Sequence, residues 1–142
     1  MKNILFILSF LISSCNSKVN TMQQNPITEY PVAVSFGSIC CGTADPDFLK
    51  SFITNYNKEN NSTMSADIMS GCGREGEFVI LINPGQMNAG TLQAMINSLE
   101  KTVTATDSTN KRNNSSSGTL ELLKNVKKDQ FSFCRIALQK WF

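Results

Sequence analysis

The sequence predicts an α+β fold, and three observations support this prediction. Three segments alternate apolar and polar or small residues with the period of a strand, one short segment is continuously apolar, and two segments carry apolar residues at helical spacing. The strand and helix patterns are interleaved along the chain. With 142 residues, the chain can build one domain with a modest core, and it is too short for two.

The first strand and the first helix have clear signals. The strand is predicted to begin near Tyr30. Its apolar residues Val32, Val34 and Phe36 alternate with small residues. Asp45-Pro46-Asp47 is typical of a helix start, because it offers a capping residue, a proline at the first helical position and an acid in the first turn. A single apolar stripe then predicts the helix: Leu49, Phe52, Ile53 and Tyr56.

Two strands joined by a hairpin are predicted next. Residues 64–69 alternate and indicate an edge strand, whereas residues 78–82 are continuously apolar and indicate a central strand. The connection at 71–76 is rich in glycine, as a tight turn requires. Its Gly-x-Gly-x-x-Gly spacing matches the dinucleotide-binding pattern, but that loop opens a helix in nucleotide-binding folds, and here it opens a strand.

A second helix is predicted after Asn83-Pro84-Gly85, with Asn88 as its cap. Its apolar residues have helical spacing: Leu92, Met95, Ile96, Leu99 and Val103. Residues 107–118 are poor in apolar residues and rich in Ser, Asn and Thr, so we expect a mobile loop there. Beyond it, residues 130–138 alternate as a fourth strand would, and a closing helix is the alternative for this segment.

With a final strand, the order βαββαβ is that of a ferredoxin-like split βαβ sandwich, in which two helices cover one face of an antiparallel sheet. In that topology the first and second strands run parallel, and the third lies antiparallel between them. The end of the first strand, the hairpin and the start of the fourth strand then share one edge of the sheet. We therefore expect four cysteines to gather there: Cys40, Cys41, Cys72 and Cys134.

These cysteines predict disulfide bonds if the domain is exported to an oxidising compartment. A bond between the neighbours Cys40 and Cys41 needs a strained small ring, so we expect one of them to pair with Cys72 and the other with Cys134. One alternative is a zinc site of all four thiolates, although such sites usually contain two C-x2-4-C pairs. Another is a thiol-redox role for Cys41 and Cys72, because Arg74 near Cys72 favours a thiolate, although no C-x-x-C motif is present.

The first fifteen residues carry a targeting pattern. Lys2 is followed by an apolar run over residues 4–12 and by Ser13-Ser14 directly before Cys15. This pattern resembles a bacterial lipoprotein signal peptide. The resemblance implies that residues 1–14 are removed and that Cys15 becomes the first mature residue, with a diacylglycerol on its sulfur and a further acyl chain on its amine.

The membrane is then the expected partner through a lipid anchor, and the protein faces the periplasm or the cell surface. Residues 15–29 are polar and predict a flexible tether, and residues 30–142 predict a single domain. The alternatives are an ordinary secretory signal and a short membrane helix. The helix is the weaker alternative because the apolar run is shorter than the roughly 20 residues that span a bilayer core.

The composition excludes several functions. Because the chain has no histidine, it cannot contain a Ser-His-Asp or Cys-His catalytic group or a histidine-based metal site. Its 13 basic residues, one of them in the signal peptide, nearly balance 11 acidic residues, so we expect no nucleic-acid partner. The one close basic set predicts a solvated surface: Lys124, Lys127 and Lys128. No cofactor is expected.

Two function classes remain. The first is a lipid-anchored, disulfide-stabilised binding or structural module that presents an edge of the domain to an envelope protein. Its predicted edge residues are Gly42, Gly73, Arg74 and Glu75. The second is a thiol-redox or Cys-ligated metal-binding periplasmic protein. Glu75 and Glu77 are expected on the outer face of a strand, and without a catalytic motif we do not expect an enzyme.

Overall fold

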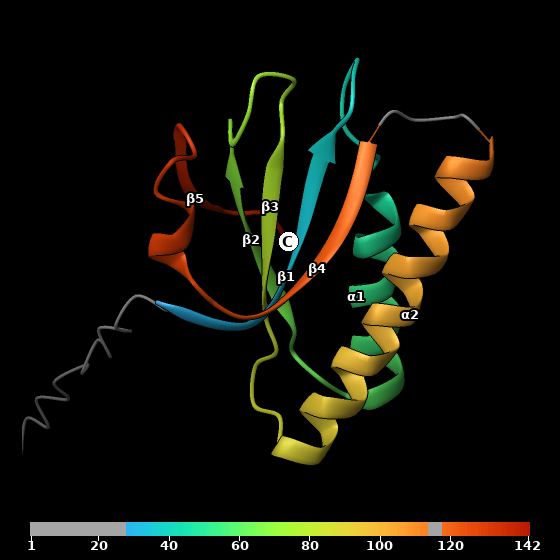
Figure 1. Ribbon diagram of the computed structural model, residues 1–142. Helices are drawn as coiled ribbons and strands as arrows, with labels where there is room; N and C mark the ends of the chain where they lie inside the picture. Colours follow the sequence, from blue (N-terminus) through green and yellow to red (C-terminus); the bar gives the residue numbers. More distant parts are fainter. Residues whose placement is uncertain (1–27, 114–117) are drawn as a thin grey trace, which may run out of the picture.

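The computed structural model describes residues 28–113 and 118–142. The elements, in chain order, are β1 (Glu29–Ser38), α1 (Asp47–Asn60), β2 (Ser65–Ser70), β3 (Phe78–Asn83), α2 (Ala89–Asn113), β4 (Gly118–Lys127), the short 3-10 helix η1 (Lys128–Phe131) and β5 (Ile136–Lys140). Figure 1 shows one sheet with α1 and α2 together beside it. The predicted α+β class is therefore confirmed. The predicted signal peptide, Cys15 and nearly all of the predicted tether lie outside the described residues.

All strand pairs in the sheet are antiparallel, in the order β4-β1-β3-β2-β5. β3 lies between β1 and β2 and runs antiparallel to both, so that Ile80 is opposite Val34 on one side and Ile68 on the other. A fifth strand pairs with β2. The ferredoxin-like βαββαβ order is therefore not matched, and the prediction that β2 is an edge strand is wrong.

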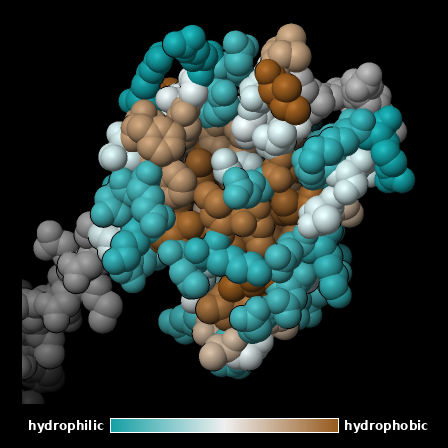
Figure 2. Space-filling view, viewed as in Figure 1, coloured by the Kyte–Doolittle hydropathy of each residue, from teal (hydrophilic) through white to brown (hydrophobic). Residues whose placement is uncertain are grey.

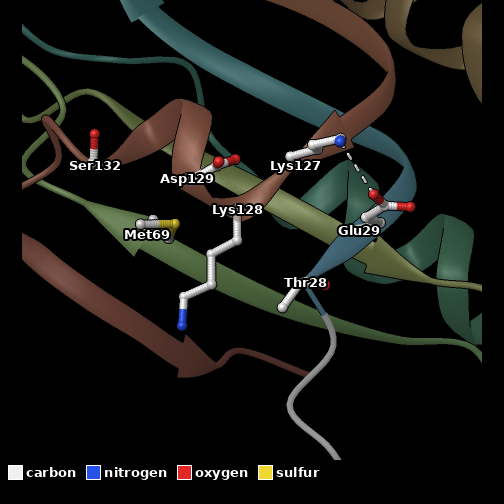
Figure 3. A pocket seen from close by; sticks show the side chains of 7 residues that line it. All are labelled: Thr28, Glu29, Met69, Lys127, Lys128, Asp129 and Ser132. Carbon is white, nitrogen blue, oxygen red and sulfur yellow. Dashed lines mark ion pairs between the residues drawn. The ribbon is translucent and has the colours of Figure 1, made fainter.

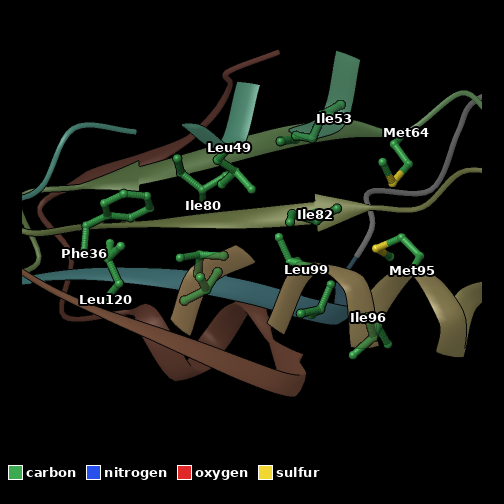
Figure 4. Packing of buried hydrophobic residues seen from close by; sticks show 14 of the residues in the cluster. Phe36, Leu49, Ile53, Met64, Ile80, Ile82, Met95, Ile96, Leu99 and Leu120 are labelled. Carbon is green, nitrogen blue, oxygen red and sulfur yellow. The ribbon is translucent and has the colours of Figure 1, made fainter. Parts of the chain in front are cut away.

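The larger core lies between the sheet and the two helices. Alternate residues of the strands point toward the helices, and the predicted stripes of both helices pack on them (Figure 4). The fully buried members include Val34, Phe36 and Ile80 of the sheet and Leu49, Ile53, Met95 and Leu99 of the helices. Because α1 and α2 contribute to the same cluster, the prediction that both cover one face is confirmed.

A smaller core lies on the opposite face of the sheet, under η1 and the segment that follows it. Its buried members are Tyr30, Ala33, Met69, Val79, Leu81, Val126, Phe131 and Cys134. The Tyr30 hydroxyl donates a hydrogen bond to Asp67 Oδ2 at 2.8 Å. Figure 2 shows apolar side chains at the centre of the molecule, over the strands, with hydrophilic residues around them.

The second helix extends through Asn113, into the segment for which a mobile loop was predicted. The polar residues of this segment fit a helix because their side chains find partners along it. The hydroxyls of Thr102, Thr106 and Thr109 donate to carbonyl oxygens four residues earlier. Lys111 also pairs with Asp107 at 2.7 Å. The loop prediction is therefore wrong for residues 107–113 and for Gly118, and residues 114–117 lie outside the description.

The strand beside β1 is β4, not the predicted segment at 130–138. Leu120 of β4 is buried against the helices, and its backbone N–H donates to Asp107 Oδ1 of α2 at 3.1 Å. Residues 130–138 instead include the end of η1, a short loop and the start of β5. The predicted strand was therefore placed too late in the chain, because β4 takes the place beside β1.

At both predicted helix starts a side chain accepts a backbone N–H of the first turn. The Asn88 Oδ1 atom accepts the N–H of Thr91 at 2.9 Å, which confirms Asn88 as a cap. At α1 the Asp45 carboxylate accepts the N–H of Asp47 at 2.9 Å, while Pro46 precedes the first helical residue. The helix starts were thus predicted to within about two residues.

Candidate functional site

Two loops project from the same end of the sheet. β1 ends at Ser38, opposite Gly118 at the start of β4, and Phe36 pairs with Phe78 at the end of the β2–β3 hairpin. Figure 1 shows the loop after β1 and this hairpin at the top of the molecule. We call residues 39–42 and 71–76 together the loop edge. It contains the predicted edge residues Gly42, Gly73, Arg74 and Glu75.

One disulfide joins Cys72 to Cys134, which are 62 residues apart in the sequence. Cys134 is buried in the smaller core, and the N–H of its neighbour Arg135 donates to the Gly71 carbonyl at 3.2 Å. Cys40 and Cys41 are free thiols and are exposed. The expected pairing of Cys40 and Cys41 with Cys72 and Cys134 is therefore wrong, because the segment after η1 places Cys134 on Cys72.

The disulfide bears on the two chemical alternatives. Cys40, Cys41, Cys72 and Cys134 do not form a site with four thiolates in this structure, because two of the four sulfurs are bonded to each other. Within 28–113 and 118–142, no group of three or more Cys, Asp or Glu side chains is placed to hold a metal ion. Cys41 and Cys72 are not paired with each other either, because Cys72 is bonded to Cys134. The thiols that remain for chemistry in the described chain are Cys40 and Cys41.

The two free cysteines interact with each other. A hydrogen bond between the Cys40 and Cys41 side chains, followed by the charge of Cys40, raises the pKa of the Cys41 thiol above its ordinary value. The charge of Glu75 in the hairpin raises the pKa of Cys41 further. The first loop and the hairpin are therefore close enough to act on each other electrostatically. A raised pKa means that Cys41 is less often a thiolate at neutral pH.

The hairpin is shaped by a carboxylate that folds back under it. Glu77 Oε2 accepts the N–H of Glu75 at 2.8 Å, and the Glu77 carbonyl accepts the N–H of Cys72 at 2.8 Å. The Glu77 carboxylate also lies where a side chain on Gly73 would be. Gly73 therefore permits this close approach, and Glu77 has a structural role. Arg74 and Glu75 remain exposed at the tip.

Gly118 is a residue of this end that the sequence analysis did not select. The backbone of Thr43 and Ala44 crosses directly over it, and a Cβ atom on Gly118 would collide with the Ala44 backbone nitrogen. Ala44 is itself buried in the larger core. The close contact fixes the end of the cysteine loop on the start of β4. A glycine at the start of a strand was the available signal.

Two exposed apolar side chains also lie in or beside the loop edge. Ile39 is 74% exposed and directly precedes the two free cysteines. Phe133 is 64% exposed and directly precedes Cys134, which the disulfide ties to the hairpin. Neither residue was predicted as part of a site, because Ile39 belongs to no periodic pattern and Phe133 lies in the segment 130–138 that was predicted as a strand.

A cavity of about 470 Å³ lies where the described chain begins, beside η1 and away from the two free cysteines. Its lining residues are Thr28, Glu29, Met69, Lys127, Lys128, Asp129 and Ser132. Lys127 Nζ pairs with Glu29 Oε1 at 3.3 Å, and Figure 3 shows the Lys128 side chain pointing away from this pair. Two lysines and two carboxylates balance, so the charge of the cavity favours neither an anion nor a cation.

Comparison of the chain with protein-family models, with curated proteins and with solved structures gives no match. The description of the loop edge therefore rests on its own geometry. Among the residues that the structure describes, α2 is the longest helix, and neither it nor α1 combines the length and apolar character needed to cross a membrane.

Proposed function

We propose that this protein is a lipid-anchored module of the bacterial cell envelope that uses its loop edge to bind an envelope protein. Cys15 carries the lipid in this proposal, and residues 15–27 connect it to the folded domain. The domain itself is a binding or structural module stabilised by the Cys72–Cys134 disulfide, and it faces the periplasm or the cell surface.

The observation that carries the proposal is the position of the loop edge relative to the start of β1. The tether joins the domain at the start of β1, and the cysteine loop follows the end of the same ten-residue strand. In Figure 1 the described chain begins at the left side of the molecule, whereas the loop edge lies at the top. A domain held at the first end can reach a partner with the second.

The surface of the loop edge supports a protein partner. Exposed Ile39 provides an apolar contact, and Arg74 and Glu75 provide one charge of each sign on the hairpin tip. Protein interfaces combine such apolar residues with charged residues at the rim. The disulfide and the Glu77 hydrogen bonds hold the hairpin in one shape, which lowers the entropy lost on binding.

Metabolic labelling tests the anchor. Bacteria that express the full chain are grown with an alkyne analogue of palmitate, and the purified protein is examined for label. We expect label on the unmodified chain, no label on Cys15→Ser, and full label on the control Cys40→Ser/Cys41→Ser. An unlabelled native sequence, or label that persists in Cys15→Ser, would show that the anchor is wrong.

Site-specific photocrosslinking in intact cells tests the loop edge. A photoreactive phenylalanine derivative replaces either Arg74 in the hairpin or Lys101, an exposed residue of α2. We expect a discrete crosslinked protein from position 74 that is absent from position 101 and weaker in an Ile39→Asp background. The binding role is refuted by equal crosslinking at both positions, or by none at position 74.

A further inference from the structure

The two free thiols of the described chain are accessible to solvent. Cys40 and Cys41 are consecutive in the sequence, are both exposed, and lie on a loop that projects from the end of the sheet. The other two described cysteines are already bonded. In an oxidising compartment, exposed thiols become oxidised. The question is which partner each sulfur takes.

Cys40 and Cys41 are adjacent in the chain, so their Cα atoms are about 3.8 Å apart and the two exposed sulfurs can reach each other. Cys41 has a φ of 69°, a left-handed backbone conformation that residues other than glycine seldom adopt. Backbone conformations of this kind cluster at active sites and switch regions.

The residue after the pair leaves room for the loop to change shape. Gly42 has a φ of 113°, and nothing lies within 4 Å of the position where its Cβ would be. A glycine is therefore favoured at position 42 by the positive φ, and not because a neighbouring atom leaves no room for a side chain. Beyond it, Ala44 is fixed against Gly118, so a change at Cys40 and Cys41 stays within the exposed part of the loop.

We propose that Cys40 and Cys41 form a thiol–disulfide exchange site that closes into a vicinal disulfide by passing two electrons to a disulfide-bearing protein or small molecule. One cysteine thiolate attacks the disulfide of the partner, forms a mixed disulfide and releases one partner thiol. The second cysteine then attacks the sulfur of the first. The Cys40–Cys41 bond forms, the second partner sulfur leaves as a thiol, and the two protons of the pair end on the two partner sulfurs.

The closed pair can also react in the opposite direction. A ring that contains one peptide bond and two adjacent cysteines is strained, and strained disulfides have more oxidising potentials than structural ones. A dithiol partner therefore reopens the ring and becomes oxidised. The inference rests on export to an oxidising compartment, which is part of the proposed function, but it does not depend on lipidation or on a protein partner at the loop edge.

Peptide mapping of the purified full-length protein tests the proposal. The protein is equilibrated with reduced glutathione and then with glutathione disulfide, quenched in acid, alkylated, and digested with trypsin without reduction. Cleavage after Lys18 and Lys50 leaves both cysteines on one peptide, residues 19–50. We expect this peptide to be two hydrogens lighter than the reduced peptide and to carry neither glutathione nor alkyl groups.

Single substitutions provide the matched controls. Cys40→Ser and Cys41→Ser each retain one thiol and should each end with one bound glutathione. In the native sequence, a peptide that carries glutathione, that remains alkylated at both thiols after oxidation, or that is linked to a second chain would overturn the proposal. Because the assay uses only glutathione, failure of the lipid-labelling or crosslinking experiments leaves its outcome unaffected.

Glu75 supplies a second readout. The groups that raise the pKa of Cys41 are Cys40 and, across the loop edge, Glu75. Removing the Glu75 charge lowers this pKa and increases the thiolate fraction, so Glu75→Gln should close the ring faster than the native sequence at neutral pH. Glu59→Gln, at an exposed position of α1, is the control and should leave the rate unchanged. A Glu75→Gln rate no faster than that of Glu59→Gln would contradict an effect of the Glu75 charge on thiol exchange at Cys41.

Discussion

Tyr30 is a buried residue whose protonation depends on the fold. Burial raises its pKa well above the ordinary value of 10.0, and the hydrogen bond to Asp67 and the charge of Asp67 raise it further. Because the pKa is higher in the folded chain than in the unfolded chain, the folded state keeps a proton that the unfolded state releases at high pH. This stabilisation is fully present below about pH 10 and is lost as the pH rises toward the folded pKa.

Tyr30→Phe should therefore make stability less sensitive to alkaline pH. We expect a loss of about 1 kcal/mol at neutral pH, from the missing hydrogen bond, and a smaller further loss above about pH 10 than in the native sequence. Urea denaturation at several pH values measures both effects. Tyr56→Phe, at the only other tyrosine, is the control. Equal alkaline losses in the native sequence and Tyr30→Phe would show that Tyr30 is not responsible.

Gly118 is required for a close backbone contact. The alanine methyl of Gly118→Ala would meet the backbone of Thr43 and Ala44, which cannot move aside as a flexible side chain could. We expect a loss of about 1–3 kcal/mol in the free energy of unfolding. Gly90→Ala is a matched control, since the nearest atom is Asn88 Oδ1 at 3.4 Å and alanine favours the helix. Equal effects of the two substitutions in denaturant titrations would refute this role.

Among the elements, α2 and β4 are joined in part by the side chain of Asp107. Asp107 accepts the N–H of Leu120 at 3.1 Å and pairs with Lys111 at 2.7 Å, with its side chain only 16% exposed. Asp107→Ala should lower the free energy of unfolding by about 1.5–3 kcal/mol, because a backbone donor of β4 loses a charged acceptor. The measurement is chemical denaturation monitored by circular dichroism.

The control at this junction is Lys111→Ala. It removes only the exposed partner of the ion pair, whose side chain is 61% exposed, and should cost less than about 0.5 kcal/mol. If both substitutions have the same effect, the ion pair accounts for the whole contribution of Asp107. The hydrogen bond from Leu120 of β4 to Asp107 would then make no measurable contribution to the free energy of unfolding.

The elements also show where sequence patterns are reliable. The helical stripes around Leu49 and Leu99 were predicted because the apolar residues that recur with the period of a helix are the ones that become buried. The length of α2 was not predicted, since Thr and Ser hydroxyls that suggest a loop also bond well inside a helix. β4 carried a signal that was missed, because Leu120 and Leu122 alternate with Thr119 and Glu121.

At the scale of the whole molecule, the Cys72–Cys134 disulfide ties the β2–β3 hairpin to the C-terminal segment. It closes a long stretch of chain, with 62 residues of separation, and so restricts the unfolded state strongly. Cys72→Ser/Cys134→Ser should lower the free energy of unfolding by about 4 kcal/mol in the chain-entropy model. Urea titrations of the oxidised protein measure this loss.

Cys40→Ser/Cys41→Ser is the matched control for the disulfide. It also removes two cysteines, but from an exposed loop, and should change the stability by less than about 0.5 kcal/mol. A large loss in this control together with a small loss in Cys72→Ser/Cys134→Ser would mean that the disulfide pairing is different. Photocrosslinking from position 74 should weaken when Cys72 and Cys134 are replaced, since the hairpin is then less restricted.

The sequence by itself determined the α+β class, the two helical stripes, the central strand and the hairpin, because each depends on periods and turn residues within a short segment. Only the tertiary structure decided that Cys134 bonds to Cys72, that β5 covers β2, and that Gly118 lies beneath Ala44. These contacts join segments far apart in the chain, and no local period specifies which distant segment will pack on a given face. The free pair at Cys40 and Cys41 follows from that packing, since Cys134 closes on Cys72 and leaves both neighbours without a distant partner among the described cysteines.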